Sequence, residues 1–460
     1  MLFRSRLDRD GPGRDVVQLS AFTVIAERDA SAQALALNEQ RHAPNIKNVV
    51  AIDEFGDRGN ENIGDFLLFL PGLSIGTSGY EPSSASLRGI PGNNTNLSID
   101  GAEVASSFAG NSRQLDLREV PANNISRVEI TKVPTPDQPA AGLGGSINLI
   151  SRSGFEATRP KFSYNLYTQF HSGRGLTFDG GPRNQSGGTS ARSNQPSFDF
   201  SYLRPVGRNF ALTFGGSRTW RHPRMLGGFN RTDTQSDWNL VDLFQRSSQW
   251  NGIAALFQTL SGQIGFDWRL RERNSLSGSF QYRHYDLYLT RSVLSWNYGA
   301  GATGNRSFVQ GAPTAVGSAT MNGSGENVNV LTETKHYALK YRHIGERWRL
   351  DASGFASLSA SDRPEIDDGI FNLTPATVSN LIIRGEGIGE SVGNIPTRYQ
   401  ATNRTGAPID LYDGANYSLV SGTTNQADWN TRKYGGRIDV TRDFRGRLDL
   451  TMKTGVALDT

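Results

Sequence analysis

Beyond residue 158, apolar and polar residues alternate in repeated blocks of about ten residues. In the first block, Phe162, Tyr164 and Leu166 fall on one face of an extended chain, whereas Lys161 and Ser163 fall on the other. A period of two predicts strands that each have one apolar and one polar face. The blocks that follow this pattern are 161–170, 198–202, 210–214, 263–270, 275–284, 337–341, 348–350, 434–440 and 447–458.

The connections between these blocks alternate between tight and long. The tight connections are 203–209, 271–274, 344–347 and 443–447, and the long connections between them grow along the chain. Short turns at one end and long loops at the other are typical of an outer-membrane β-barrel. A soluble sandwich with one wet face would also alternate. It would not explain the one-sided long loops or the aromatic residues that mark the blocks, so the pattern favours a barrel.

A barrel assigns a side to each residue, because the apolar face of a strand meets lipid and the polar face meets the lumen. We expect the tight turns on the periplasmic side. The residues expected to face lipid are Phe162, Tyr164, Phe198, Phe200, Ile264, Phe266, Trp268, Leu450 and Met452. The residues expected to face the lumen are Lys161, Asp267, Arg269 and Asp449.

The N-terminal third of the chain has a different pattern, with short mixed clusters of apolar residues. Asn60 or Asn62 can cap a short helix over 63–70, which the Pro71-Gly72 pair ends. Strands are expected over 96–101, 125–133 and 146–153, and Gly/Ser-rich loops over 84–92 and 106–114. These elements predict a small α/β domain that precedes the barrel.

Composition excludes several other classes of protein. The longest apolar stretch, 66–73, is far shorter than the ~18 residues of a spanning helix, and the mean hydropathy is −0.47. The absence of cysteine excludes a disulfide framework and a cysteine nucleophile. A net charge of +4 gives no reason to expect nucleic-acid binding. The 52 glycines with 10% aromatic residues favour an all-β chain over a disordered one.

No group of residues in the sequence predicts catalysis or a metal site. The six histidines are scattered without metal-ligand spacing. Glu365, Asp367 and Asp368 lie in the longest loop, where solvated carboxylates are a better interpretation than a glycosidase pair. We therefore expect no enzyme, no cofactor and no metal.

The order of the N-terminal elements resembles the plug domain of TonB-dependent outer-membrane receptors. Five pieces in the family's order support this resemblance. They are 65–75, Arg88-Gly89, 97–101, 125–132, and Gly144-Gly145 followed by Ile147, Asn148 and Ile150. The resemblance implies a membrane β-barrel, all-β and antiparallel, with a small N-terminal α/β plug domain. The expected boundaries are 1–40 for an N-terminal tether, 41–157 for the plug and 158–460 for a partial barrel.

The sequence also departs from the family. Residues 132–136, Lys-Val-Pro-Thr-Pro, stand where the family has a Lys/Arg-Gly-Pro turn. The family's barrel has twenty-two strands, whereas about nine are expected here, and the N-terminus carries no secretory signal. From these departures we expect a fragment truncated at both ends; a degenerate gene product would look the same.

The resemblance implies active import across the bacterial outer membrane, driven by the TonB–ExbB–ExbD complex. The family's substrates are iron–siderophore complexes, cobalamin and glycans, and the sequence does not choose among them. The alternative is an outer-membrane adhesin whose loops bind a surface without transport. A globular domain sized to fill the lumen favours the transporter.

Site residues follow from the same resemblance. The segment 16–24 resembles the TonB box, an extended strip that can add a strand to a partner's sheet. Its residues are Val16, Val17, Gln18, Leu19, Ser20, Ala21, Phe22, Thr23 and Val24. Arg88 is expected at the interface of plug and barrel, with an exposed loop arginine as the alternative. Tyr80, Phe108, Asn111 and Arg113 are expected on the plug apices that face substrate.

Overall fold

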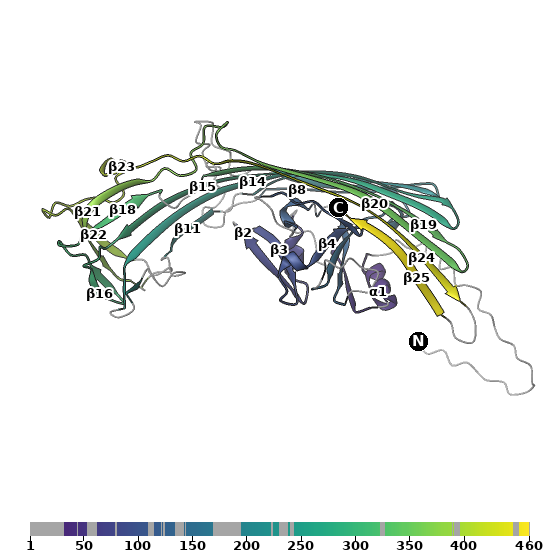
Figure 1. Ribbon diagram of the computed structural model, residues 1–460. Helices are drawn as coiled ribbons and strands as arrows, with labels where there is room; N and C mark the ends of the chain where they lie inside the picture. The colour runs from purple at the N-terminus through teal and green to yellow at the C-terminus, as the bar shows by residue number, and fades with distance from the viewer. Residues whose placement is uncertain are drawn as a thin grey trace, which may run out of the picture.

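The structure is a computed structural model of the chain. It describes residues 32–43, 45–52, 62–78, 81–108, 115–120, 122, 125–133, 142, 144–168, 195–221, 224–229, 238–239, 243–322, 327–388, 390, 396–444 and 450–459. A long curved wall of antiparallel strands carries a compact domain on its concave side (Figure 1). This compact domain, residues 32–157, is called the plug domain below.

The plug domain is a small α/β unit. Its helices and strands are α1 (Ala32–His42), β1 (Lys47–Ala51), α2 (Gly64–Leu67), β2 (Leu73–Ser78), β3 (Glu81–Leu87), β4 (Asn96–Ile99), β5 (Ala102–Glu103), β6 (Ile125–Thr131) and β7 (Ser146–Ser151). Short 3-10 helices are η2 (Gly92–Asn94), η3 (Leu117–Glu119) and η4 (Gly154–Glu156). The main sheet has the order β1-β6-β7-β4-β5, and β2 and β3 form a separate hairpin. Part of the stretch expected as a Gly/Ser loop, 84–92, is therefore strand β3.

Apolar residues from most of these strands close one core. Ile63, Leu87, Ile130 and Ile147 are fully buried in it. Helix α2 begins directly after Ile63, which provides no side-chain cap, and the expected residue Asn62 lies one position earlier, where its Oδ1 accepts a hydrogen bond of 2.9 Å from the Gly64 N–H. Gly145 has φ +117°, and a Cβ there would collide with the Thr131 carbonyl, which explains the glycine before β7.

Helix α1 lies across the boundary expected at residue 40 and packs against the sheet. Ala36 is buried with Val49 and Ala51 of β1. Lys47 bridges Glu39 of α1 and Glu129 of β6, at 2.8 and 2.7 Å. Burial alone would raise the pKa of Glu39, but a hydrogen bond with the Glu129 side chain and the cations Lys47 and Arg127 outweigh it and lower the pKa to about 2. This helix is thus joined to the plug sheet by both packing and charge.

Nine strands form the wall, as the sequence predicted. They are β8 (Lys161–Tyr167), β9 (Ser197–Val206), β10 (Phe210–Arg221), β14 (Ser247–Arg271), β15 (Asn274–Asn297), β19 (Val328–Ile344), β20 (Trp348–Pro364), β24 (Gln426–Phe444) and β25 (Leu450–Asp459). Each strand pairs antiparallel with the next in this order. The strands run past the alternating blocks: β14 has 25 residues, whereas a spanning strand needs about 9–11. The added length explains why the connections do not grow steadily along the chain.

The tight connections lie together at one end of the wall. In the described residues these are 207–209, 272–273 and 345–347, and the fourth expected turn lies outside them. Helix α1 lies toward this end in Figure 1, and the β2–β3 hairpin lies toward the long connections. This arrangement agrees with the predicted sidedness.

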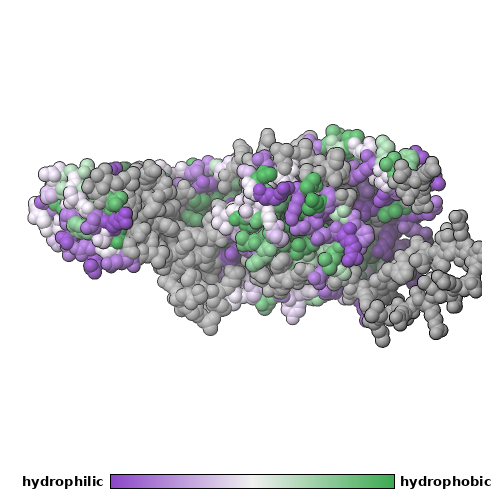
Figure 2. Space-filling view, turned by 90° about the horizontal axis from the view of Figure 1, so that it is seen from below, coloured by the Kyte–Doolittle hydropathy of each residue, from purple (hydrophilic) through white to green (hydrophobic). Residues whose placement is uncertain are grey.

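The two faces of the wall carry the predicted residues. Tyr164, Ile264 and Met452 are 69%, 52% and 58% exposed on the convex face. Asp267 instead lies on the concave face, where its carboxylate contacts the plug domain. Asp449 lies outside the described residues. Viewed from the concave side, hydrophilic and hydrophobic residues intermix (Figure 2).

The long connections build an extension beyond the wall. Its strands are β11 (Arg224–Phe229), β12 (Trp238–Asn239), β13 (Phe244–Gln245), β16 (Thr303–Asn305), β17 (Phe308–Gln310), β18 (Gly317–Met321), β21 (Ala376–Glu386), β22 (Arg398–Thr402) and β23 (Ser418–Leu419), with the 3-10 helix η6 (Gly414–Asn416). Trp296, Tyr298, Leu381 and Ile383 are buried in its own apolar core. The loop carboxylate Glu365, expected in solvent, is fully buried and pairs with Arg363 at 2.8 Å. Among the described residues, no helix is long and apolar enough to cross a membrane.

The two faces of β19 provide a direct test of sidedness. Tyr337 points outward and is 43% exposed, whereas the next residue, Ala338, lines the concave cavity described below. We expect Tyr337→Arg to lower the yield of folded barrel, because a lipid-facing arginine costs about 2–4 kcal/mol near the bilayer midplane. Ala338→Arg is the matched control and should fold normally. The folded fraction of both variants is measured on gels, from the band that keeps the mobility of the folded barrel without boiling. A lower yield for Ala338→Arg than for Tyr337→Arg would mean that the strand is shifted by one residue.

Candidate functional site

The candidate site is the seam between the plug domain and the concave face of the wall. The concave positions of β20 carry small hydroxyl side chains, which leave room for the plug backbone. The Ala105 N–H donates to the Ser357 Oγ at 2.9 Å, and the Ser107 and Ser359 hydroxyls lie 2.6 Å apart. These contacts fix one plug loop, residues 105–108, to the wall.

Glu119 ties the same loop to itself and to β20. Its Oε1 accepts from the Ser107 and Phe108 N–H groups, at 3.0 and 2.9 Å, and from the Ser359 hydroxyl at 3.1 Å. Its side chain lies in η3, which begins where the Asp116 carboxylate accepts from the Arg118 N–H. Burial is the main reason that the pKa of Glu119 rises to about 7, and the nearby Asp116 adds to the shift.

Phe108 does not face solvent, in contrast to the expectation that it faces substrate. It is 8% exposed and packs with Phe257, Tyr285 and Val330 of the wall. Its ring meets the Tyr285 ring edge-on at 5.6 Å, and the Arg118 guanidinium lies 3.9 Å from its centroid on the plug side. An aromatic ring at the tip of a loop gains more by filling this cluster than by contacting water.

A second contact joins the β2–β3 hairpin to the wall. Glu81, at the start of β3, accepts from Arg221 of β10 at 2.9 Å and from the Tyr285 hydroxyl of β15 at 2.8 Å. The Glu81 side chain is 5% exposed and that of Arg221 is 25% exposed. A buried carboxylate that accepts two hydrogen bonds holds the hairpin in place more strongly than a surface ion pair would.

A third contact fixes the chain where it leaves the plug domain. The Asp267 carboxylate accepts from the Ser153 hydroxyl at 2.7 Å and from the Gly154 N–H at 3.0 Å. The Arg269 guanidinium lies 4.0 Å from the centroid of the Phe155 ring. Asp267 and Arg269 therefore lie on the concave face, as the sequence predicted, and they anchor the connection into β8.

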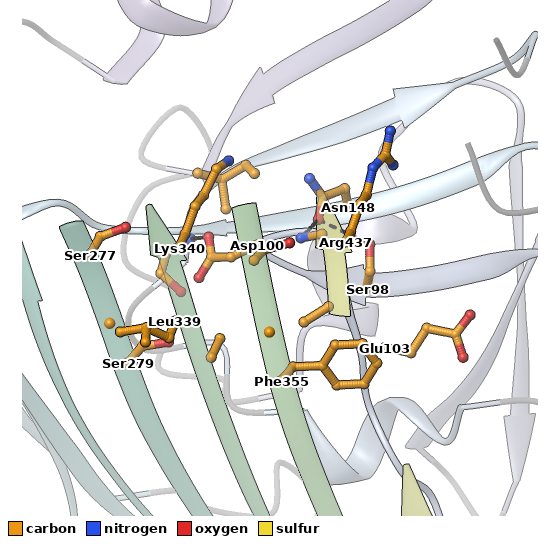
Figure 3. Close-up of a pocket in the computed structure, with 18 of the residues that line it drawn as sticks. Ser98, Asp100, Glu103, Asn148, Ser277, Ser279, Leu339, Lys340, Phe355 and Arg437 are labelled. Carbon is orange, nitrogen blue, oxygen red and sulfur yellow. Dashed lines mark hydrogen bonds between the residues drawn. The ribbon is translucent and has the colours of Figure 1, made fainter. Parts of the chain in front are cut away.

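Between these contacts lies a polar cavity of about 1050 Å³. Its plug side includes Ser98, Asp100 and Asn148, and its wall side includes Lys340 and Arg437. Figure 3 shows Asp100 and Lys340 reaching into the same gap from opposite sides. Burial raises the pKa of Asp100 above its ordinary range, although the bond from the Ser151 N–H and the charge of Lys340 oppose the shift.

An ion pair spans the seam near this cavity. Glu103 of β5 pairs with Lys433 of β24 at 3.0 Å. The two side chains are 23% and 31% exposed, so water can reach both. The lining of hydroxyl, amide and charged groups can hold water or a hydrophilic solute, whereas an apolar molecule would leave these groups unpaired.

Most of the site residues expected from sequence are not described by the structure. Residues 16–24, Tyr80, Asn111 and Arg113 lie outside the described residues. Arg88 is exposed, has φ +58° and donates to the Lys132 carbonyl at 3.2 Å. Its described bond thus stays within the plug domain, and its place at the interface with the barrel remains a prediction.

Sequence reasoning missed the residues that make the seam. One signal was available: Ser353, Ser357, Ser359 and Ser361 recur at every second or fourth position of β20. A hydroxyl stripe on the polar face of a strand indicates close contact with another backbone. The partners Glu81 and Glu119 could not be found in this way, because their contacts join residues more than a hundred positions apart.

The Glu81–Arg221 pair gives a quantitative prediction. We expect Glu81→Gln and Arg221→Met each to loosen the β2–β3 hairpin, and Glu81→Gln also changes the bond from Tyr285, so the direct Glu81–Arg221 interaction is measured by the coupling in the double-mutant cycle, expected at about 1–3 kcal/mol. Hydrogen exchange of the β3 amides measures the opening. Glu103→Gln at the more exposed pair is the control and should change β3 exchange little. Additive effects of the two substitutions would contradict a direct interaction.

Comparisons with known proteins identify the plug domain. Residues 39–146 match the family model of the TonB-dependent receptor plug domain. No curated protein matches the sequence. Solved structures that resemble the chain include the ferric enterobactin receptor PfeA of Pseudomonas aeruginosa, with 12% identity over 94% of this chain and 58% of that one and a TM-score of 0.39. The ferric preacinetobactin receptor BauA of Acinetobacter baumannii has 11% identity over 90% and 61% of the two chains, with a TM-score of 0.38.

The chain thus spans only about three-fifths of the length of these receptors. Its described part combines an α/β domain with a wall of antiparallel strands that expose apolar side chains on one face. The chain therefore carries a TonB-dependent receptor plug domain at residues 39–146, joined to strands of the outer-membrane β-barrel type, and its location is the bacterial outer membrane.

Proposed function

We propose that this chain is part of a transporter that imports a scarce solute across the outer membrane. The plug domain closes the lumen at rest, and import requires it to move away from the wall or to rearrange against it. The alternative of an adhesin gives no reason for a globular domain inside the barrel.

The observation that carries this proposal is the chemistry of the seam. The contacts of the plug domain with the wall are largely hydrogen bonds and ion pairs, such as Ala105–Ser357, Glu81–Arg221 and Glu103–Lys433. Water can replace a neutral bond of this kind at a net cost of about 1 kcal/mol and a bond to a charged group at a net cost of about 1.5–3 kcal/mol. The plug's own core is apolar and closed. The domain can therefore leave the wall in steps while its core stays folded.

We propose that the energy arrives through the N-terminal tether. The outer membrane has no ATP, so work must be transmitted mechanically from the TonB–ExbB–ExbD complex. The segment 16–24 is β-prone and is proposed to pair with TonB by strand addition. A pull on this segment would reach α1 first. From α1 the force would pass through Glu39 and Lys47 to the plug sheet.

The extension beyond the wall is the proposed place of substrate capture. Trp296, Tyr399 and Tyr412 form a ladder of rings, with centroids 5.5 and 5.9 Å apart, that leads from its core to the surface. Tyr412 is 57% exposed and can stack on a ring of a ligand. The proposed substrates remain a siderophore-bound iron, cobalamin or a glycan.

The tether can be tested apart from substrate capture. Deletion of 16–24 should abolish uptake and leave binding at the cell surface intact, because the proposal has the tether act on the periplasmic side and the substrate bind on the outer side. Leu19→Pro should act like the deletion, since proline removes a donor and fixes φ. Leu19→Ala is the milder control.

The measurement uses cells that carry the complete receptor and a labelled panel of ferric siderophores, cobalamin and oligosaccharides, with binding and uptake counted separately. Normal uptake by the Leu19→Pro variant would place the coupling segment elsewhere. Loss of binding in the same variant would show that the tether has a structural role in the plug.

A further inference from the structure

Glu119 is a carboxylate buried at the seam without a cation. It is 1% exposed, and one oxygen accepts three hydrogen bonds from the plug loop and from Ser359. Its other oxygen, Oε2, has no hydrogen bond in the described structure. Among the described residues, no lysine or arginine lies within ion-pair distance of it; Arg118, its neighbour in sequence, pairs with Asp116 at 2.6 Å. Burying such a charge is costly, and binding a proton removes the part of this cost that comes from the charge.

Other ionisable groups on the elements around η3 are already engaged or are neutral. They are Asp116 and Arg118 on η3 itself, Glu81 on β3, Arg283 and Tyr285 on β15, and His336 on β19. Arg283 donates to the Val120 carbonyl at 2.9 Å, and Tyr285 donates to Glu81. Protonation of the buried His336 ring would add a charge to the seam, so acid acting there would loosen the contact rather than tighten it.

We propose that Glu119 is a proton-controlled latch between the plug loop 105–108 and strand β20. A proton is bound at the Glu119 carboxyl while the loop is docked. When the loop separates from Ser357 and Ser359, water reaches the carboxyl and the proton is released. Opening of the seam is therefore coupled to the loss of one proton.

The direction of the pH effect follows from this coupling. In the docked state the pKa of Glu119 is raised to about 7, whereas a solvated glutamate has its ordinary pKa of 4.5. The docked state then binds more protons than the open state between these values, so acid stabilises docking and alkali favours opening. Between pH 8.5 and pH 5.5 the docking equilibrium should tighten by about 30-fold if both values hold.

This inference rests on the proposed function only in that the plug loop must separate from the wall. Its test measures the loop itself and needs no substrate, TonB or uptake. If the pH test of the loop fails, the proposal of transport still stands. If the proposal of transport fails, the pH dependence of the loop still stands.

The absence of cysteine permits a clean probe of loop opening. Ala105 is fully buried and contributes only its N–H to the seam, so Ala105→Cys introduces one thiol that a maleimide reaches when the loop opens. The labelling rate of the full chain in detergent micelles is divided by the rate of the same chain in denaturant at each pH. This ratio removes the pH dependence of the thiol and should rise about 30-fold from pH 5.5 to pH 8.5.

Glu119→Gln in the Ala105→Cys background should abolish this rise and hold labelling at the slow, acidic rate, because glutamine is neutral at every pH. Glu103→Gln is the matched control: it removes another plug carboxylate at the seam and should keep the full pH dependence. If Glu119→Gln does not fold, the parent profile still decides. A flat ratio, a ratio that falls with pH, or an unchanged rise in Glu119→Gln would overturn the proposal.

Discussion

A strand of an outer-membrane barrel must present apolar side chains to lipid on one face and polar side chains to the interior on the other. The rest of this structure depends on that constraint. It places Tyr164, Ile264 and Met452 outside, and it leaves hydroxyls, amides and charges inside. A domain that fills the interior must then offer polar partners, since each buried donor or acceptor left unpaired is costly. The plug domain does so with backbone N–H groups, Glu81 and Glu119.

This constraint separates two kinds of cohesion in one chain. The plug core is held by apolar burial, with residues such as Ile130 and Leu149 removed from water. The seam is held by hydrogen bonds, which water can replace at small net cost. An apolar contact also crosses the seam, where Phe108 of the plug loop packs on Tyr285 and Phe257 of the wall. A domain built in this way can separate from the wall before it unfolds.

The period-two pattern was sufficient to predict the nine wall strands, because successive side chains of a strand point to opposite faces. It placed Ile264 outside and Asp267 inside correctly. The same pattern was insufficient for the plug domain, where β3 was taken for a loop since Ser-rich strands lack the alternating signal. Helix α1 was hidden in a stretch expected to be a tether, and its docking depends on Lys47 and Glu129, which come later in the chain.

The contacts of the candidate site were less predictable from the sequence than the fold was. Seam contacts join residues far apart in sequence, such as Glu119 with Ser359, and no local rule selects the partner. Phe108 illustrates the limit, because an aromatic residue in a Gly/Ser loop can face solvent or fill a pocket, and only the pocket decides. The family resemblance supplied the architecture correctly, and its placement of Arg88 at the interface of plug and barrel stays a prediction, since the described hydrogen bond of Arg88 goes to the Lys132 carbonyl.

The central claim is that the plug loop 105–108 must leave β20 for a solute to pass. A disulfide tests it most directly, since the sequence contains no cysteine and the Ala105 N–H lies 2.9 Å from the Ser357 Oγ. In a complete receptor, the pair Ala105→Cys and Ser357→Cys should cross-link under oxidation, block uptake and leave surface binding intact, and a reductant should restore uptake. Uptake at the parent rate with the cross-link shown to be complete would contradict the account.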